Sequence, residues 1–166
     1  MKMKITELLS PENIRQGVSF SSKKRLFESI AHFVEEQILA EQGEQACFEC
    51  LFEREKLGNS GLGNGIAMPK AKIPVTVSDK AIAVFMQLDN PIGYDAFDGK
   101  PVDLIFALLI PENQCETYIP ILASLIEKLT DKNVLKQLRS AKSADEIWQV
   151  FEITDQSETT LEEVKE

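Results

Sequence analysis

The chain has 166 residues, of which 43% are apolar and 27% are charged, and its formal net charge is −9. This length is typical of one domain, and the composition excludes a chain that is disordered throughout or inserted in a membrane. Binding to nucleic acid needs a basic face that neutralises phosphates, so we expect no nucleic-acid partner and favour basic proteins as partners.

The first residues, "MKMKITELLSPENI", lack a continuous apolar segment, and no stretch is long enough for a transmembrane helix. We therefore expect a cytoplasmic protein without membrane insertion. The three cysteines have no disulfide-scaffold spacing, which predicts free thiols in a reducing compartment.

Two amphipathic helices are predicted in the N-terminal third. The first begins at Ser21 or Ser22 as N-cap, ends at Gly43, and carries apolar residues at helical spacing: Leu26, Phe27, Ile30, Ala31, Val34, Ile38 and Leu39. The second follows at once and closes at Gly58, with Ala46, Cys47, Cys50, Leu51 and Leu57 as its apolar positions.

A glycine-rich loop over residues 59–65 precedes a short strand over 66–73 that is interrupted at Pro69. The runs at 81–88 and 102–110 are continuously apolar, as in strands covered on both faces, so we expect them at the centre of a sheet. The connection between them is too rich in turn-forming residues for a helical crossover. This favours antiparallel pairing and therefore a mixed sheet.

Three more helices are expected after Pro111. The first has Ile119, Leu122, Leu125, Ile126 and Leu129 on one face; the second begins at a capping Asn133; the third begins at Ser143, with Glu146 completing a capping box. Helices before and after the strands predict a single three-layer α/β/α domain with a mixed central sheet over residues 1–154. Residues 155–166, with four Glu and one Asp against one Lys, are expected to form an acidic, disordered and solvated tail, with a short partner-binding segment as the less favoured alternative.

The segment "GNSGLGNGIAMPK" (58–70) carries glycines at 58, 61, 63 and 65. Such spacing serves a tight turn, which is the interpretation that spacing alone favours, or a nest of backbone N–H groups that binds an anion. It is neither a Walker loop, since it lacks the Gly-Lys-Ser/Thr ending, nor a dinucleotide fingerprint, which needs a strand before it and a helix after it.

The stretches "REKLGNSGLGNGIAMP" (54–69) and "PIGYDAFDGKPVDLIFALLIPENQ" (91–114) resemble the IIA domains of the phosphoenolpyruvate-dependent phosphotransferase system, in the fructose/mannitol family and especially its nitrogen-regulatory branch. The resemblance extends from the first helix to Phe151. It implies that a small phosphocarrier protein donates a phosphoryl group to a histidine after the Pro of the glycine segment. It also implies a second histidine facing the first.

At those two positions this chain has Lys70 and Tyr118. An imidazole is neutral near pH 7 and can accept and release a phosphoryl group, whereas a lysine ammonium has no free lone pair until it loses its proton. The resemblance also makes Arg54 the arginine beside the phosphoryl site, and Gly61, Gly63, Asn64 and Gly65 its anion-binding loop. Retaining Arg54 while gaining Lys70 predicts a cationic pocket.

Other candidate residues have simpler interpretations. His32, the only histidine, lies on an amphipathic helix and is expected at the surface or its boundary. Cys47 and Cys50 have the spacing of a redox or metal motif, but a zinc site needs two further ligands, so core or boundary positions are favoured. We expect no cofactor and no metal site. The lone Trp148 is expected in the core.

Three functional hypotheses follow. The leading one is a nitrogen-regulatory IIA-like protein that no longer accepts a phosphoryl group and regulates by binding other proteins, for which the resemblance implies potassium-transport regulators as a partner class. The alternative is an active phosphocarrier, accepting phosphoryl from a phosphocarrier protein at Lys70 or another residue; Arg54 favours it by favouring a neutral lysine. The third, a redox or metal module, rests only on the cysteines.

Overall fold

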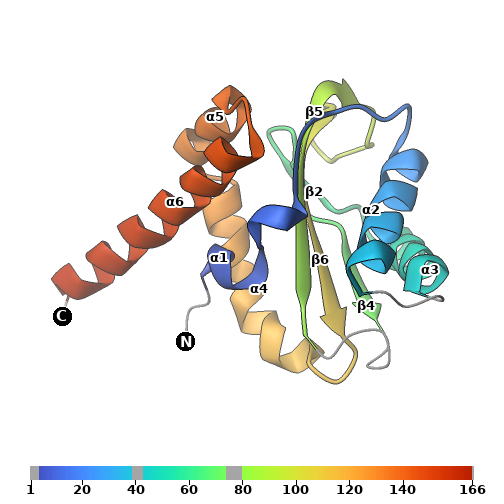
Figure 1. Ribbon diagram of the computed structural model, residues 1–166, viewed down its shortest axis with the longest axis horizontal. Coiled ribbons are helices and arrows are strands. Elements are labelled where there is room, and N and C mark those ends of the chain that lie inside the picture. Colours follow the sequence, from blue (N-terminus) through green and yellow to red (C-terminus); the bar gives the residue numbers. More distant parts are fainter. Residues whose placement is uncertain (1–3, 39–42, 74–79, 166) are drawn as a thin grey trace.

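The computed structural model describes residues 4–38, 43–73 and 80–165, and shows one sheet between two layers of helices (Figure 1). One face carries α2 (Lys23–Ile38) and α3 (Gly43–Leu57). On the other side lie α1 (Ile5–Leu8), α4 (Cys115–Leu129), α5 (Lys132–Ser140) and α6 (Ala144–Lys165). The predicted three-layer α/β/α domain is confirmed. Over the described ranges, none of these helices combines the length and the apolar character needed to cross a bilayer.

The sheet is mixed, as predicted. Its strands are β1 (Ile14–Val18), β2 (Gly61–Gly63), β3 (Ile66–Ala67), β4 (Lys70–Ile73), β5 (Ile82–Ile92) and β6 (Val102–Pro111), and a short 3₁₀ helix, η1 (Pro11–Asn13), precedes β1. The order is β1-β5-β6-β3-β2, with β4 also pairing with β6. The β5–β6 and β2–β3 pairs are antiparallel, whereas β1 runs parallel to β5, and both β3 and β4 run parallel to β6.

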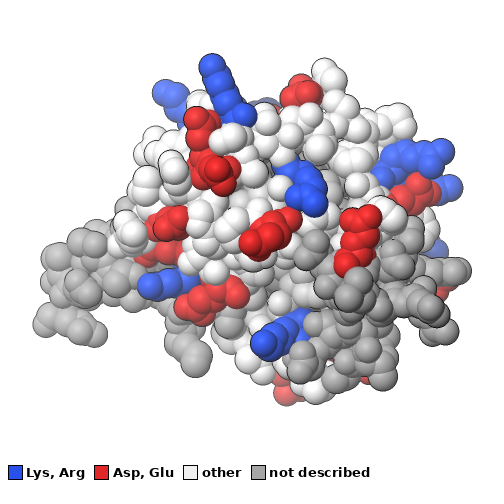
Figure 2. Space-filling view, in the orientation of Figure 1, with Lys and Arg blue, Asp and Glu red and all other residues white. Residues whose placement is uncertain are grey.

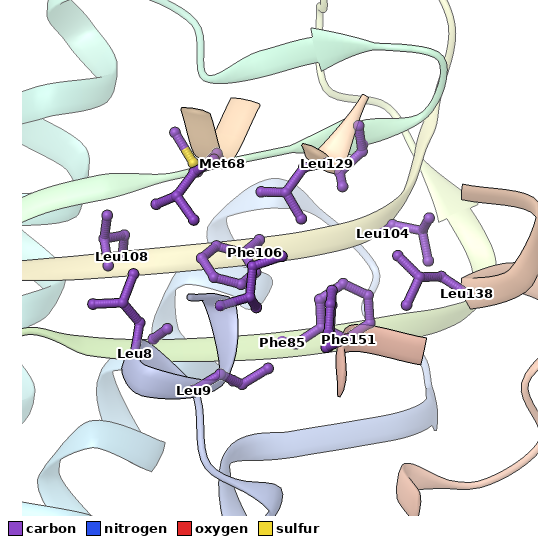
Figure 3. Close-up of a cluster of buried hydrophobic side chains, with 14 of the residues drawn as sticks. Leu8, Leu9, Met68, Phe85, Leu104, Phe106, Leu108, Leu129, Leu138 and Phe151 are labelled. Carbon is purple, nitrogen blue, oxygen red and sulfur yellow. The ribbon is translucent and has the colours of Figure 1, made fainter. Parts of the chain in front are cut away.

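Strands β5 and β6 form the centre of the sheet because apolar side chains on both of their faces are buried. Successive residues alternate between two clusters: Phe85 and Phe106 face the α4–α6 side, and Val84 and Ala107 face α2 and α3. Figure 3 shows Phe151 of α6 beside Phe85, and their rings meet edge to face with centroids 5.1 Å apart. Continuous apolar sequence therefore marks central strands here, as predicted.

The glycine segment is a β-hairpin, so the prediction of a loop over residues 59–65 is wrong. Strands β2 and β3 pair across a two-residue turn at Asn64 and Gly65, whose φ angles are 58° and 84°. Two successive residues with positive φ match the right-handed twist of a hairpin, and Asn-Gly is a strongly preferred sequence for such a turn. The strand predicted over 66–73 is confirmed as β3 and β4, with the interruption at Pro69.

Several helix ends differ from the predictions. The Ser22 hydroxyl accepts the N–H of Arg25 and so confirms the first cap, but Gly43 is the first residue of α3, not the end of α2, and residues 39–42 lie outside the described ranges. Asp131, not Asn133, caps α5, because its carboxylate accepts the N–H groups of residues 133 and 134 at 2.9 and 3.1 Å.

Helix α6 begins as predicted, since the Ser143 hydroxyl accepts the N–H of Glu146 at 3.1 Å. The Glu146 carboxylate, however, accepts the N–H of Lys142 and not that of the cap residue, so the box is displaced by one residue. The helix then continues to Lys165, through the residues predicted to be a solvated tail. The division of the chain into 1–154 and 155–166 stays a prediction, although Asp155 itself is buried.

Asp155 fixes the N-terminus of the chain to α6. Its side chain is only 3% exposed, and its two oxygens accept the N–H groups of Ile5 and Thr6 at 3.0 Å and the Thr6 hydroxyl at 2.9 Å. The Lys128 ammonium lies 3.6 Å away. The carboxylate thus caps α1 and joins it to α4 and α6, where burial gives these charged hydrogen bonds more weight than exposed ones have.

We expect Asp155→Asn to lower the free energy of unfolding by about 2–4 kcal/mol, because the amide loses the charge and turns N–H groups toward the donors that the carboxylate accepts. Urea denaturation followed by circular dichroism measures this. Glu152→Gln, an exposed position on the same helix, is the matched control and should change stability by less than about 0.5 kcal/mol. Equal stability of the two variants would contradict the role assigned to Asp155.

Candidate functional site

Lys70 is the first residue of β4 and follows the hairpin directly. Its backbone pairs with Leu108 on β6, and its half-buried side chain turns back so that Nζ lies 3.5 Å from the carbonyl oxygen of Met68, a long hydrogen bond. Pairing with a central strand fixes the backbone of Lys70. Its ammonium is therefore held at a defined position beside the hairpin, not displayed on a loose loop.

The surroundings of Lys70 disfavour its charge. Burial, followed by the Arg54 guanidinium, lowers the pKa of Lys70 from its ordinary value of 10.5, and Glu55 acts in the opposite direction. Arg54 lies in the last turn of α3, where its Nη1 donates to the carbonyl of Gly58 at 3.3 Å. The structure thus brings Lys70 and Arg54 close enough for two like charges to interact.

Glu55, next to Arg54, connects the helical layer to the hairpin. Its Oε1 accepts the Ser60 N–H at 2.9 Å and lies 2.5 Å from the Lys23 ammonium of α2. The buried Ser60 hydroxyl forms a 2.6 Å hydrogen bond with the Tyr94 hydroxyl, and the Lys23 ammonium sits 4.2 Å from the centre of the Tyr94 ring. Burial raises the pKa of Tyr94, so its phenol stays neutral and forms a hydrogen bond with the Ser60 hydroxyl. Because these contacts are continuous, we call the four residues Lys23, Glu55, Ser60 and Tyr94 the Glu55 network.

Two N–H groups of the predicted anion-binding loop already have partners. The Gly61 N–H donates to the Asn59 side chain at 2.8 Å, and the Asn64 N–H donates to the Asp98 carboxylate at 2.9 Å. The backbone N–H groups of Asn64 and Lys100 hold the pKa of Asp98 below its ordinary value, so this carboxylate is ionised and repels a second anion. In this conformation the hairpin is not an open nest, and its anion-binding role stays a prediction.

An ion pair braces the turn of the hairpin. The Arg139 guanidinium of α5 meets the Asp103 carboxylate of β6 with Nε to Oδ2 at 3.0 Å and Nη2 to Oδ1 at 2.9 Å, and Nη2 also donates to the Asn64 carbonyl. A bidentate pair fixes orientation as well as distance. The remaining predicted loop residues, Gly63 and Gly65, have φ angles of 93° and 84° and serve the hairpin geometry.

Tyr118 lies in the first turn of α4 and is 8% exposed. It belongs to the same buried cluster as Met68 and Leu108, the residues that flank or pair with Lys70 along the sheet. Burial raises the pKa of Tyr118, so its hydroxyl stays protonated at neutral pH. It therefore lies in the apolar cluster between α4 and the sheet.

The histidine and the cysteines occupy the positions that the sequence favours. His32 is exposed on α2, with Nε2 3.1 Å from the Glu36 carboxylate. Cys47 is buried and Cys50 half-buried, both as free thiols, and burial raises the pKa of Cys47 to about 12. A thiol with a raised pKa is a poor nucleophile and a poor metal ligand, which speaks against a redox or metal module.

Comparison with known proteins decides the family. Residues 7–153 match the family described as "Phosphoenolpyruvate-dependent sugar phosphotransferase system, EIIA 2". The chain belongs to this EIIA 2 family. It is 98% identical over 164 residues to the "Nitrogen regulatory protein homolog" of Haemophilus influenzae, covering 99% of this chain and all of that protein.

Two further comparisons place the chain in the nitrogen-regulatory branch of the EIIA 2 family. It is 39% identical to the "Nitrogen regulatory protein" of Escherichia coli strain K12, with 92% of each chain covered. It also superimposes on the crystal structure of the nitrogen regulatory protein IIA-Ntr from Neisseria meningitidis with a TM-score of 0.80 and 37% identity, covering 89% of this chain and 98% of that one. The predicted family and branch are confirmed.

Membership in the EIIA 2 family does not test the roles of individual residues, so the roles of Lys70, Tyr118, Arg54 and the hairpin glycines stay predictions. The Glu55 network is the part of the site that sequence reasoning missed. Tyr94 and Ser60 are 34 residues apart, and no local pattern links them. The only signal is the mixed polar and aromatic character of the connection before β6, which by itself indicates no more than a turn.

Gly65→Ala tests the braced turn. An added Cβ would clash with the Arg139 guanidinium, come 2.9 Å from an Asp103 oxygen, and occupy a φ of +84° that alanine disfavours. We expect a loss of about 1–3 kcal/mol in the free energy of unfolding, measured by urea denaturation. Gly93→Ala, where a Cβ meets open space, is the control and should be nearly neutral; a comparable loss there would refute the explanation.

The electrostatics of Lys70 can be read from its own titration. We expect Arg54→Gln to raise the pKa of Lys70 toward its ordinary value, because a like charge that opposes protonation is removed. Nuclear magnetic resonance of ¹³Cε-labelled lysine over a pH series measures this shift, with Lys70→Arg used to assign the signal. The control is Arg25→Gln, on the outside of α2 beside Glu28. It removes one positive charge at another position and should leave the titration curve of Lys70 unchanged. A lower Lys70 pKa in Arg54→Gln would contradict the expected sign.

Proposed function

We propose that this protein is a nitrogen-regulatory IIA protein that does not accept a phosphoryl group and regulates other proteins by binding them. The observation that carries the proposal is Lys70, which stands after Pro69 where the family resemblance implies the acceptor histidine. Its side chain is half-buried and donates to the Met68 carbonyl. A protonated amine that is also a hydrogen-bond donor has no lone pair for attack on phosphorus.

The charge of Lys70 indicates which signalling state the protein resembles. A phosphorylated histidine would add about two negative charges, whereas Lys70 adds one positive charge at the same backbone position. A partner that distinguishes the two states by charge would therefore always bind this protein as it binds the unphosphorylated form. The resemblance points to potassium-transport regulators as one class of such partners, and to the phosphocarrier protein as another protein able to dock.

Exposed apolar side chains near the predicted site support a binding role. Leu57 and Phe97, at 84% and 81%, have the highest exposures among the large apolar residues described. Leu57 ends α3 beside Arg54, and the Phe97 ring lies against Gly63 of the hairpin. Ile119, next to Tyr118, is also exposed. Large apolar side chains exposed around one site favour contact with another protein.

The alternative, an active phosphocarrier at Lys70, has one observation in its favour. Burial and Arg54 lower the pKa of Lys70, which increases the fraction of neutral amine. Glu55 opposes this shift in the pKa of Lys70, and the Lys23 ammonium offsets the negative charge of Glu55. An ordinary lysine at pH 7 is neutral in only about one molecule in 2,500, so its pKa would have to fall by about four units to match that of an imidazole.

A phosphoryl-transfer assay separates the two functions. The protein is incubated with phosphoenolpyruvate, the upstream enzyme and the phosphocarrier protein, and its intact mass is measured under alkaline conditions. We expect no gain of one phosphoryl group, because the ammonium of Lys70 cannot attack phosphorus. Phosphorylation of the phosphocarrier in the same sample shows that the upstream steps work.

The companion variant is Lys70→His with Tyr118→His. A mass gain in this variant alone would show that the rest of the site still supports transfer and that the acceptor is what is missing. A stoichiometric gain in the unmodified protein would overturn the binding-only proposal. Lys70→Gln then tells whether Lys70 or another residue is the acceptor.

A further inference from the structure

A hollow with a volume of about 630 Å³ lies at the turn end of the hairpin, and Lys70 is not among the residues that line it. One wall is the face of α5, a second is the connection between β5 and β6, and the rim includes Asn64 and Gly65. Its size falls within the range of small-molecule sites in proteins, about 300–1,000 Å³.

Cations converge on this hollow from two elements. Lys132, Lys136 and Arg139 follow one another at intervals of four and three residues, so they share one face of α5, and Lys100 faces them from the β5–β6 connection. Arg139 is compensated by Asp103, but the three lysines form no ion pair with any residue that the structure describes. An excess of positive charge is thus concentrated in a chain whose net charge is −9.

The carboxylates near the hollow are already engaged. Asp103 holds Arg139, Asp131 caps α5, and Asp98 accepts the N–H groups of Asn64 and Lys100. Figure 2 shows acidic and basic side chains interspersed over the face in view, with blue side chains projecting at the top, above α5, and red ones directly below them. The four cations that line the hollow still outnumber the carboxylates of Asp103 and Asp98, so a positive charge remains that attracts an anion from solution.

The remaining wall of the hollow is apolar. Pro91, near the end of β5, and Pro101, just before β6, line it on one side, and Leu135, which is only 2% exposed, lines it from α5. Prolines are rigid and offer flat surfaces for a ring, whereas an inorganic anion gains nothing from them. Lysines at one side and apolar walls at the other suit a ligand that has both an anionic and an organic part.

We propose that this hollow binds a phosphorylated small organic molecule, with its phosphate groups among Lys100, Lys132 and Lys136 and its organic part against Pro91, Pro101 and Leu135. Lysine ammonium groups bind phosphate as point charges, and three of them match a diphosphate in charge. The site does not depend on any phosphoryl transfer at Lys70. It would bind a ligand reversibly, without chemical change.

A bound ligand would also act on the hairpin. Arg139 connects the hollow to the Asn64 carbonyl and to Asp103, and phosphate oxygens compete for the same guanidinium. The backbone amides of Asn64 and Gly65 should therefore report binding through their chemical shifts. These two signals locate the bound ligand in the hollow whatever its chemical identity.

Adenosine diphosphate without metal ions is a suitable probe, and adenosine and pyrophosphate represent its organic and anionic parts. Each of the three compounds is titrated into ¹⁵N-labelled protein at constant ionic strength. We expect saturable shifts at Asn64 and Gly65 with the diphosphate, weaker binding of pyrophosphate, and no binding of adenosine at the same concentrations. The double variant Lys132→Gln with Lys136→Gln should bind the diphosphate at least about tenfold more weakly, because it removes two of the three lysine charges that have no ion-pair partner among the described residues.

The matched control is Lys24→Gln with Lys56→Gln, which removes the same charge from the exposed surface of α2 and α3. Its affinity for the diphosphate should stay within about twofold of the unmodified protein, since screened charges at a distance contribute little. An equal loss in both double variants would show general counterion binding and overturn the proposal. No saturation at millimolar diphosphate, or equal binding of adenosine, would overturn it too.

Two remaining outcomes test the class of ligand. Pyrophosphate that binds as tightly as the diphosphate would contradict the role of the apolar walls. A polyglutamate peptide that shifts the same amides, with no binding of the diphosphate, would assign the hollow to an acidic protein segment and overturn the small-molecule proposal. Circular dichroism of each variant confirms that it is folded, and the substituted lysines are exposed.

Discussion

The geometry of the candidate site depends on the carboxylate of Glu55. It receives the Lys23 ammonium from α2 and the Ser60 N–H from the start of the hairpin, while its own backbone belongs to α3. Ser60 extends the connection to Tyr94, in the segment between the two central strands. One side chain therefore positions the hairpin against both helices of its layer. Because these groups are largely buried, losing one partner would leave another polar group unpaired, which costs more than a surface contact.

The same carboxylate balances the charge around Lys70. Burial and Arg54 oppose a proton on Lys70, and Glu55 favours it, so the state of the amine reflects a competition among three side chains at the end of one helix and the start of one strand. A histidine at this backbone position would be neutral near pH 7 without such compensation. In the proposed function, Lys70 at the acceptor position is thus more than a change of nucleophile: it places a cation that the site has to accommodate, where binding needs no reactive group.

The sequence predicts the parts of the fold that rest on local patterns. Continuous apolar runs identify β5 and β6 because both of their faces are buried, and Ser22 and Ser143 mark helix starts because a cap is a local hydrogen bond. Strand β1 has no such pattern, since only Ile14 is buried in it. The contacts of Asp155 with residues 5 and 6, about 150 positions away, have no signal in a single sequence, and neither has the Ser60–Tyr94 bond. Composition predicts an acidic tail from residue 155, whereas α6 continues through it and Asp155 is buried.

The hairpin links the two proposals through its two ends. At its start, Ser60 is held by Glu55 and Tyr94, beside the position of Lys70; at its turn, Asn64 is held by Arg139 and Asp98, beside the basic hollow. Between them lie only three residues of β2, and β3 leads back to Lys70. A ligand that draws Arg139 away from the turn would therefore loosen the end that carries no buried network, while the Glu55 end keeps the surface around Lys70 in place.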